Sequence, residues 1–303
     1  MSAPRFNIVI GKGGVGKTLT CILNATRAGR SGLRTLLCEL NTDESVAQHL
    51  GCRESKGEIV QVGNDFHLVN IHPERALQEY AKLKLHLPKL GQKVFEQPMV
   101  KTLVDFVPGM SELLMLGKAF NHERETTKSG HPKWDMVIID SPATGHGVTF
   151  LGLPDIIASA VPRGNMHQES AAMNRLLHDR TKTRIDLVTI AERLPVHEAL
   201  ELQQLLKDEV GLEIGRVIVN KYHRGFSLPE TLEKLSHFNQ EHHPQHRTLL
   251  NELKADHEAR DYIKLLKGLE VPTFVIEKHR RLPFEGLTEQ ILSEMLEKYT
   301  PWA

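Results

Sequence analysis

The sequence predicts an α/β protein whose central sheet is mainly parallel and doubly wound, with helices on both faces. Two observations lead to this prediction. Short apolar runs recur along the chain, and each ends in small or polar residues, as buried parallel strands do. Longer stretches with helical spacing separate these runs, which is the pattern of repeated βαβ units. No Gly/Ser-rich or Pro-rich linker divides the 303 residues, so we expect one domain over residues 1–303.

The first apolar run, Phe6 to Ile10, leads directly into a glycine-rich loop. The residues of this loop that we expect to bind a nucleotide are Gly11, Lys12, Gly13, Gly14, Val15, Gly16, Lys17 and Thr18. They fit G-x-x-x-x-G-K-[ST], in which glycines let backbone N–H groups approach phosphates and the next helix directs its positive end at the anion. Lys17 then neutralises the β- and γ-phosphates, and the Thr18 hydroxyl binds Mg²⁺. The alternative is a plain glycine-rich turn with a solvated lysine.

A second buried run, Thr35 to Leu40, is followed by Asp43. Ligands of open parallel sheets collect at the carboxyl ends of strands, so we expect Asp43 to project toward the phosphate loop. There its carboxylate can orient or deprotonate a water that attacks the γ-phosphate. The alternative role of Asp43 is that of a simple helix N-cap. The neighbouring Glu44 adds a second carboxylate, to which the pattern assigns no role.

A third run, Met136 to Asp140, is an apolar strand that closes on an aspartate, as a Walker B position requires. We expect Asp140 to hold the hydration shell of Mg²⁺. The region of Gly145, free of Cβ crowding, can approach the γ-phosphate and move on hydrolysis. His146 either couples that movement to a dimer interface or is a hydrogen-bonded structural histidine. Together with the loop, this strand predicts a P-loop fold that binds and hydrolyses a nucleotide with Mg²⁺.

Three later apolar runs complete the predicted sheet: Ile185 to Ala191, Gly215 to Val219 and Val271 to Ile276. A final helix is predicted from Glu285 to Tyr299. Its polar face carries mainly glutamates, which anionic lipid would repel, so we expect this helix to pack on the sheet rather than on a membrane.

The loop Gly-Lys-Gly-Gly-Val-Gly-Lys-Thr resembles the deviant Walker A motif of a group of dimeric ATPases. The group includes arsenite-pump ATPases, tail-anchored-protein targeting factors, chromosome-partitioning and division-site ATPases, and nitrogenase iron protein. The resemblance implies that Lys12 reaches the nucleotide held by the opposite subunit. The alternative is a solvated charge near the tip of the loop.

Within that group, the chain is most similar to the arsenite-pump and targeting-factor family, over nearly its whole length. Asp43 matches the hydrolytic aspartate of the family segment Thr-Asp-Pro-Ala-His, although the chain departs from that segment immediately afterwards. Asp140 and the ending Thr144-Gly145-His146 match the family's second switch, whose middle residues are exchanged here. Asn220 matches an asparagine that reads the adenine edge, where an amide offers both a donor and an acceptor. A turn at a strand end is the alternative for Asn220.

The resemblance implies a Mg²⁺-dependent ATPase that works as a nucleotide-gated dimer, either a homodimer or a heterodimer with a related ATPase. In that reaction Asp43 positions water, while Lys17 and, across the dimer, Lys12 stabilise the transferred charge. Hydrolysis would be coupled to the binding or delivery of a cargo or a membrane partner. The alternative function is a slow ATP/ADP binding switch that recruits a protein partner, without a membrane-protein or anion cargo.

A helical subdomain is expected from about residues 73–128 and 155–183. It contains predicted helices at Pro73–Val107 and Met110–His122, broken at Pro108-Gly109. The apolar face of the second helix is either core or, as the resemblance implies, part of a groove for a membrane-protein client. Few large apolar residues follow in 155–183, so we expect such a groove to be abridged or absent.

Composition excludes several other classes of function. Lys plus Arg equals Asp plus Glu at 38 each, so no overall basic field favours a nucleic-acid partner. The chain offers no signal-peptide segment and no apolar run long enough to span a membrane, which predicts a cytoplasmic protein. The family's zinc pair and metalloid cysteines are missing, since the cysteines form no C-x-x-C pair. We expect the histidines at 242, 243 and 246 to form a polar loop rather than a metal site.

Overall fold

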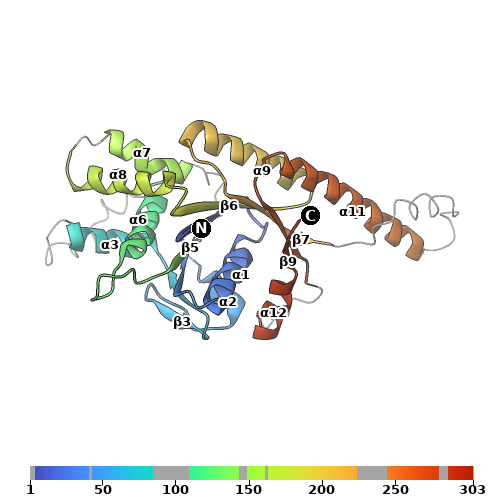
Figure 1. Cartoon of the computed structure of the whole chain (residues 1–303), viewed down its shortest axis with the longest axis horizontal. Helices are drawn as coiled ribbons and strands as arrows, with labels where there is room; N and C mark the ends of the chain where they lie inside the picture. Colours follow the sequence, from blue (N-terminus) through green and yellow to red (C-terminus); the bar gives the residue numbers. More distant parts are fainter. Residues whose placement is uncertain are drawn as a thin grey trace.

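The computed structural model describes residues 4–40, 43–84, 109–142, 149–160, 163–223, 244–279 and 286–302, with the side chains at 80–84, 149 and 244–253 left out (Figure 1). A nine-stranded sheet runs through the molecule in the order β3-β4-β2-β5-β1-β6-β7-β8-β9. Its strands are β1 (Phe6–Ile10), β2 (Thr35–Glu39), β3 (Val60–Val62), β4 (Phe66–Asn70), β5 (Met136–Asp140), β6 (Thr183–Ile190), β7 (Arg216–Tyr222), β8 (Thr273–Glu277) and β9 (Tyr299–Pro301).

The interior of the sheet is parallel, and its two edges are antiparallel. All pairs within the run β4-β2-β5-β1-β6-β7-β8 are parallel, whereas β3 runs antiparallel to β4 and β9 runs antiparallel to β8. The strand β1 lies in the middle, between β5 and β6. The connection from β1 leads to β2, which lies on the β5 side of β1. The connection from β6 leads to β7, which lies on the opposite side of β1. The carboxyl end of β1 is therefore a topological switch point, where open α/β sheets bind their ligands.

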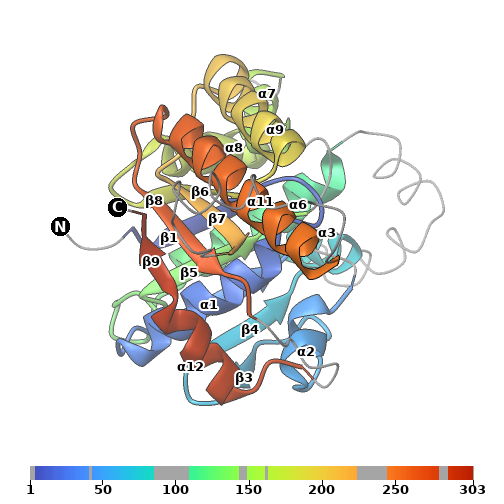
Figure 2. The ribbon, with the colours of Figure 1, turned by 90° about the vertical axis from the view of Figure 1, so that its right-hand side faces the viewer.

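Helices cover both faces of this sheet (Figures 1 and 2). One face carries α1 (Lys17–Arg30), α2 (Ser45–Leu50) and α12 (Glu289–Glu297). The other carries α3 (Pro73–Lys84), α6 (Met110–Arg124), α7 (Thr149–Ala160), α8 (Asn165–His178), α9 (Arg193–Leu205), a short π-helix η1 (Leu206–Val210) and α11 (Pro244–Lys267).

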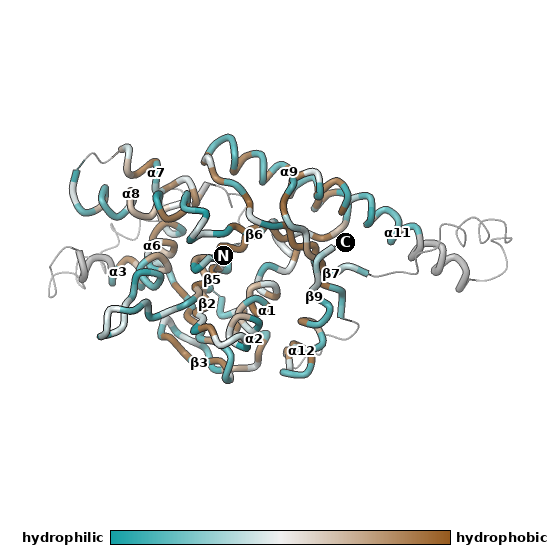
Figure 3. Tube along the Cα trace, in the orientation of Figure 1, coloured by the Kyte–Doolittle hydropathy of each residue, from teal (hydrophilic) through white to brown (hydrophobic). Residues whose placement is uncertain are grey.

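The alternation of side chains along β1 divides the interior into two cores. Phe6, Ile8 and Ile10 face the larger core with α6 to α9, whereas Val9 faces the smaller core with α1, α2 and α12. All four are fully buried. Hydrophobic residues accordingly concentrate along the strands (Figure 3). The predicted doubly wound α/β fold is thus confirmed, because both faces of the parallel strands are apolar.

The predicted strands are present, with ends shifted by a few residues, but some elements were not predicted. The strands β3, β4 and β9 and the short helix α2 had no predicted counterpart. The predicted C-terminal helix is too long at both ends. It begins only at Glu289, where the Thr288 side chain caps it by accepting from the Ile291 amide, and Tyr299 already belongs to β9. Of the predicted helix Pro73–Val107, the described part ends at Lys84, and the remainder lies outside the described residues.

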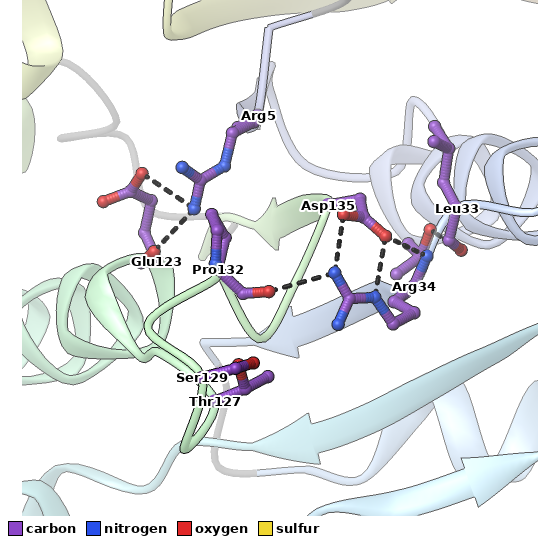
Figure 4. A network of polar contacts seen from close by, with 9 residues as sticks. Arg5, Leu33, Arg34, Glu123, Thr127, Ser129, Pro132 and Asp135 are labelled. Carbon is purple, nitrogen blue, oxygen red and sulfur yellow. Dashed lines mark hydrogen bonds and ion pairs between the residues drawn. The ribbon is translucent and has the colours of Figure 1, made fainter.

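Two ion pairs fasten the amino-terminal edge of the sheet (Figure 4). Arg34, just before β2, donates two hydrogen bonds of 2.9 Å to the Asp135 carboxylate, just before β5. Hydrogen bonds from Arg34 lower the pKa of Asp135. Arg5, just before β1, donates to the carbonyl of Glu123 at 3.0 Å and pairs with its carboxylate, which ties α6 to the central strand. This edge is held by charged groups, while the opposite, carboxyl edge carries the candidate site.

Candidate nucleotide-binding site

The glycine-rich loop connects β1 to α1 in a conformation that glycine alone tolerates. The φ angles of Gly11, Gly14 and Gly16 are 152°, 78° and 93°, all in the region that disfavours other residues. A Cβ on Gly11 would lie 2.3 Å from the Val188 carbonyl oxygen, and one on Gly16 would lie 2.0 Å from Nδ2 of Asn220. Gly11 and Gly16 are therefore required here both by backbone angle and by close packing, and Gly14 by backbone angle alone.

Lys17 lies beneath the loop and holds it from inside. The side chain is buried, and Nζ donates hydrogen bonds to the carbonyls of Gly11 at 3.0 Å and Lys12 at 3.1 Å. Burial lowers the pKa of Lys17, whereas the charge of Asp140 acts in the opposite direction. The ammonium is thus already placed where an anion bound in the loop would meet it.

Two side chains from the end of β7 hold the other side of the loop. Asn220, itself buried, donates from Nδ2 to the Val15 carbonyl at 2.9 Å. Its neighbour Lys221 donates from Nζ to the Gly14 carbonyl at 3.0 Å. Loop carbonyls are thus engaged by donors from α1 and β7. The loop amides are the groups that we expect to meet an anion, as in other anion-binding backbone nests.

A hydroxyl and a carboxylate meet where a metal ion would be held. Thr18, at the start of α1, donates from Oγ1 to Oδ2 of Asp140 at 2.7 Å, so the two residues that we expect to hold Mg²⁺ are in contact. The second oxygen, Oδ1, is buried, and no nitrogen or oxygen donor among the described residues reaches it. Burial raises the pKa of Asp140, while the Thr18 hydrogen bond and the Lys17 charge oppose that rise. This pair of oxygen donors fits a hard cation.

Asp43 lies at the same edge of the sheet, beyond β2. Its side chain is exposed, and its carbonyl accepts hydrogen bonds from the Ser45 amide at 2.9 Å and from Nδ2 of Asn70 at 3.3 Å. The N-cap position of α2 is Glu44, so Asp43 precedes the helix by one further residue. The exposed carboxylate is therefore available, and its role toward water stays a prediction.

The Glu44 side chain, to which the sequence assigned no role, holds a loop. Its carboxylate accepts hydrogen bonds from the backbone amides of Ser55 at 2.8 Å and Lys56 at 2.6 Å. It thereby connects the start of α2 to the turn that precedes β3. Glu44 is thus a structural residue of the segment that follows Asp43.

Glu39, the last residue of β2, is a buried acid that sequence analysis missed. It is fully buried and accepts hydrogen bonds from the Val46 amide at 3.2 Å and from Nδ2 of Asn70 at 3.3 Å. Burial raises the pKa of Glu39 to about 7, against the lowering effect of the Asn70 hydrogen bond. The signal in the sequence is a single acid inside the apolar run Thr35 to Leu40. Glu39 and Asn70 together fix the backbone that leads from Asp43 into α2.

Lys12, the residue that distinguishes the deviant motif, contacts α9 of its own chain. Its Nζ lies 3.8 Å from Oε1 of Glu198, and both side chains are about a third exposed (34% and 31%). An ion pair at this distance and exposure contributes little stability. The contact within one chain leaves the predicted contact across a dimer untested.

Several predicted site residues fall outside the described residues. These are Gly145 and His146 of the predicted second switch, the histidines at 242 and 243, and the side chain of His246. Within the described ranges, no group of three His, Cys, Asp or Glu residues could hold a metal ion. Burial raises the pKa of both Cys21 and Cys38, which pack in the two cores. None of the helices in the described part of the chain has the length and apolar character needed to cross a membrane.

An apolar cavity lies among α3, α6, α7 and α8, where the sequence led us to expect little or no groove. It has a volume of about 90 Å³. The large apolar side chains that line it are Met110, Leu113, Leu114, Phe120, Ile157, Met166 and Met173. The Lys118–Glu79 ion pair forms part of its wall. The helical region thus contains an apolar space built mostly from α6 and α8.

Comparison with known proteins points to one family. The family model described as anion-transporting ATPase matches residues 4–172, which include the loop, Asp43 and Asp140. A Mycobacterium tuberculosis protein named ATPase BagA is 30% identical over 240 residues, covering 77% of this chain and 70% of its own length. A Chlorobaculum tepidum protein, provisionally named an arsenical pump-driving ATPase, is 22% identical over 275 residues (86% of this chain, 64% of its own). ATPase ASNA1 homolog 1 of Paramecium tetraurelia is 24% identical over 255 residues (70% and 73%).

Proposed function

Because this chain belongs to the anion-transporting ATPase family, it is an ATP hydrolase, and we propose that its hydrolysis depends on Mg²⁺ and gates a dimer that binds a cargo or a membrane partner. The observation that carries the proposal is the contact between Thr18 and Asp140 beside the glycine loop. A hydroxyl and a buried carboxylate, one oxygen of which no described nitrogen or oxygen donor reaches, are groups that would suit Mg²⁺ next to a phosphate site.

The proposed reaction uses the loop for binding and the carboxyl edge for hydrolysis. Loop amides and Lys17 would hold the β- and γ-phosphates. Thr18 would hold Mg²⁺ directly, and Asp140 would hold it through water. Asp43 orients a water whose oxygen forms a bond to the γ-phosphorus. The bond from that phosphorus to the bridging oxygen of ADP breaks, and the proton of the water leaves with Asp43 or the phosphate. The products are ADP and inorganic phosphate.

The test of this chemistry is phosphate release and nucleotide binding by two variants. Lys17→Ala should lose nucleotide binding and hydrolysis together, because it removes the cation of the phosphate site. Asp43→Asn should bind ATP as wild type does and release phosphate about 100-fold more slowly or worse, as expected for loss of a positioned base. Wild-type turnover by Asp43→Asn would show that another residue positions the water. Removal of Mg²⁺ by EDTA should stop turnover and be reversed by excess Mg²⁺.

The proposal of a dimer is based on Lys12. The weak contact with Glu198 is easily exchanged, so Lys12 is free to approach a nucleotide on a neighbouring copy or on a related ATPase. In sedimentation experiments, Asp43→Asn with ATP should shift to a dimer, and the double variant Lys12→Ala/Asp43→Asn should not. An unchanged dimer in the double variant would contradict the contact across subunits.

A cargo is supported by the apolar cavity in the helical region, which no step of hydrolysis requires. We propose that this region binds a membrane-protein client or a pump subunit, and that the protein acts in the cytoplasm without a nucleic-acid partner. The experiment is capture of partners by Asp43→Asn with ATP from a lysate of the source cell, with Lys17→Ala as control and mass spectrometry as readout. Hydrophobic membrane proteins in the captured set would support this role. Cell fractionation tests the location.

The second candidate function is a binding switch, favoured by the exposed carboxylate of Asp43, for which no side-chain hydrogen bond is found among the described residues. In this function ATP and ADP states recruit a soluble partner, and hydrolysis only resets the complex. Phosphate release would then stay very slow in the isolated protein and rise when the captured partner is added. Capture of a related ATPase or soluble regulators alone would favour the switch.

A further inference from the structure

Lys221 has a backbone conformation that the surrounding structure must hold in place. Its φ of 54° lies in the left-handed region, which among the described non-glycine residues is shared only with Lys56 and Glu270. Lysine, unlike glycine or asparagine, rarely adopts this conformation without a local reason. Such residues concentrate at ligand sites, where contacts over-determine the backbone.

The reason lies in a bulge of β7. The register between β7 and β8 shifts between Val219 and Tyr222, and both of these side chains face the larger core. Regular alternation would send Lys221 to the core side together with Val219. The extra residue instead sends both Asn220 and Lys221 toward the phosphate loop, where they donate to neighbouring loop carbonyls.

Asn220 and Lys221 differ in how much of the side chain is exposed. Asn220 is 1% exposed, and its amide is engaged with the loop. Lys221 is exposed, and only the end of its side chain is fixed, by the Gly14 carbonyl. A fixed ammonium with an exposed stem leaves the methylene groups on the surface beside the loop.

The topology indicates which part of a nucleotide would lie there. Thr18 and Asp140 meet on the β5 side of β1, and a Mg²⁺ ion held by them would neutralise charge on the β- and γ-phosphates. The β- and γ-phosphates therefore belong to that side. Because β7 lies on the opposite side of β1, beyond β6, a nucleotide extending away from the metal brings its nucleoside toward Lys221.

We propose that Lys221 is a nucleotide-binding residue whose stem forms one wall of the site for the nucleoside of ATP. The methylene groups pack against the flat apolar face of the base, while the Gly14 carbonyl holds the ammonium in place and keeps the stem extended. A bulky flat base gains from such a wall, and a bare phosphate chain does not. This inference rests on the proposed binding of ATP at the loop.

The test compares binding of Mg-ATP with binding of Mg-tripolyphosphate, which has the phosphates without the nucleoside. Lys221→Ala should weaken ATP binding about tenfold and leave tripolyphosphate binding within about twofold. Lys221→Met, which keeps an apolar stem but loses the ammonium, should fall between Lys221→Ala and wild type for ATP. Lys56→Ala is the matched control, because Lys56 is an exposed lysine with the same left-handed backbone (φ 49°) and makes no contact with the loop in the described residues. It should bind both ligands as wild type does.

Two results would overturn the inference. One is wild-type ATP affinity in Lys221→Ala. The other is an equal loss of ATP and tripolyphosphate binding, which would make Lys221 a support of the loop alone. Thermal unfolding without ligand shows whether each variant is folded. Failure of the proposed function is distinct, because the wild-type protein would then bind neither ligand.

Discussion

The glycine loop and the helical region around the cavity are built by different means. Directional hydrogen bonds from Lys17, Asn220 and Lys221 hold the loop, and two of its glycines have no room for a Cβ. The helices α3, α6, α7 and α8 pack by apolar side chains, leave a cavity and expose Ile156 and Met166 to solvent. Hydrogen bonds fix the positions of their atoms within tenths of an ångström. Apolar packing requires mainly that the side chains have a matching total volume. The candidate nucleotide site should therefore tolerate little change in sequence, and the helical region much more.

The largest expected effect is that of Asp140→Asn on Mg²⁺-dependent hydrolysis. The amide keeps the shape and can still accept the Thr18 hydrogen bond, but it lacks the charge that attracts the metal. Phosphate release should fall about 100-fold or more, in the range seen when one electrostatic partner of a transition state is removed. Asp135→Asn is the control, because Asp135 lies at the other edge of β5 and pairs with Arg34. Equal rates of phosphate release in the two variants would contradict the assignment of hydrolysis to the carboxyl edge of the sheet.

The next effect is the loss of stability in Gly16→Ala. The left-handed φ and the 2.0 Å approach of Asn220 both oppose a Cβ, so the free energy of unfolding should fall by about 3 kcal/mol or more. Gly13→Ala is the matched control within the same loop, because no described atom lies within 4 Å of its added Cβ. It should change the stability by no more than about 0.5 kcal/mol. Urea unfolding without nucleotide measures both variants, and similar stabilities would contradict the packing argument.

Glu39 should make the stability of the protein depend on pH. Its folded pKa of about 7 lies above the ordinary 4.5, so the folded state binds the proton more tightly than the unfolded chain. The resulting stabilisation is fully present below about pH 4.5 and is lost as pH rises through 7, up to about 3 kcal/mol in total. Urea unfolding between pH 5 and 8 should show this loss in wild type.

Glu39→Gln should remove that part of the pH dependence, because glutamine does not titrate. Glu54→Gln is the control at an exposed position and should keep the wild-type slope. Identical slopes in Glu39→Gln and wild type would mean that Glu39 is ionised throughout this range.

The smallest expected effect, and one of opposite sign, belongs to Gly117→Ala in the helical region. Gly117 lies inside α6 and borders the cavity, and its added Cβ would lie at an ordinary 3.6 Å from Cε of Met173. Alanine should stabilise the helix by about 0.5–1 kcal/mol. Phosphate release should not change. A loss of stability as large as that of Gly16→Ala would remove the contrast between the two regions.

Sequence reasoning located the parts of the site that depend on local pattern. The loop from Gly11 to Thr18 and the strand ending in Asp140 carry their signal in consecutive residues, and both occupy the predicted places. Glu39 and Lys221 escaped prediction, because burial by α2 and β4 and a bulge between β7 and β8 are set by distant segments. The strands β3 and β9 escaped as well, since three residues are too few for a periodicity to show.

The same two short strands bear on how the protein avoids uncontrolled self-assembly. An exposed sheet edge offers unpaired backbone groups to any other chain and can seed aggregation. Here both edges are closed by strands of only three residues, and β9 ends in Pro301, which has no backbone N–H to donate. Growth of the sheet from one copy into the next is disfavoured at either end. The association that we propose is therefore expected at the helices and at the carboxyl edge, beside the candidate nucleotide site.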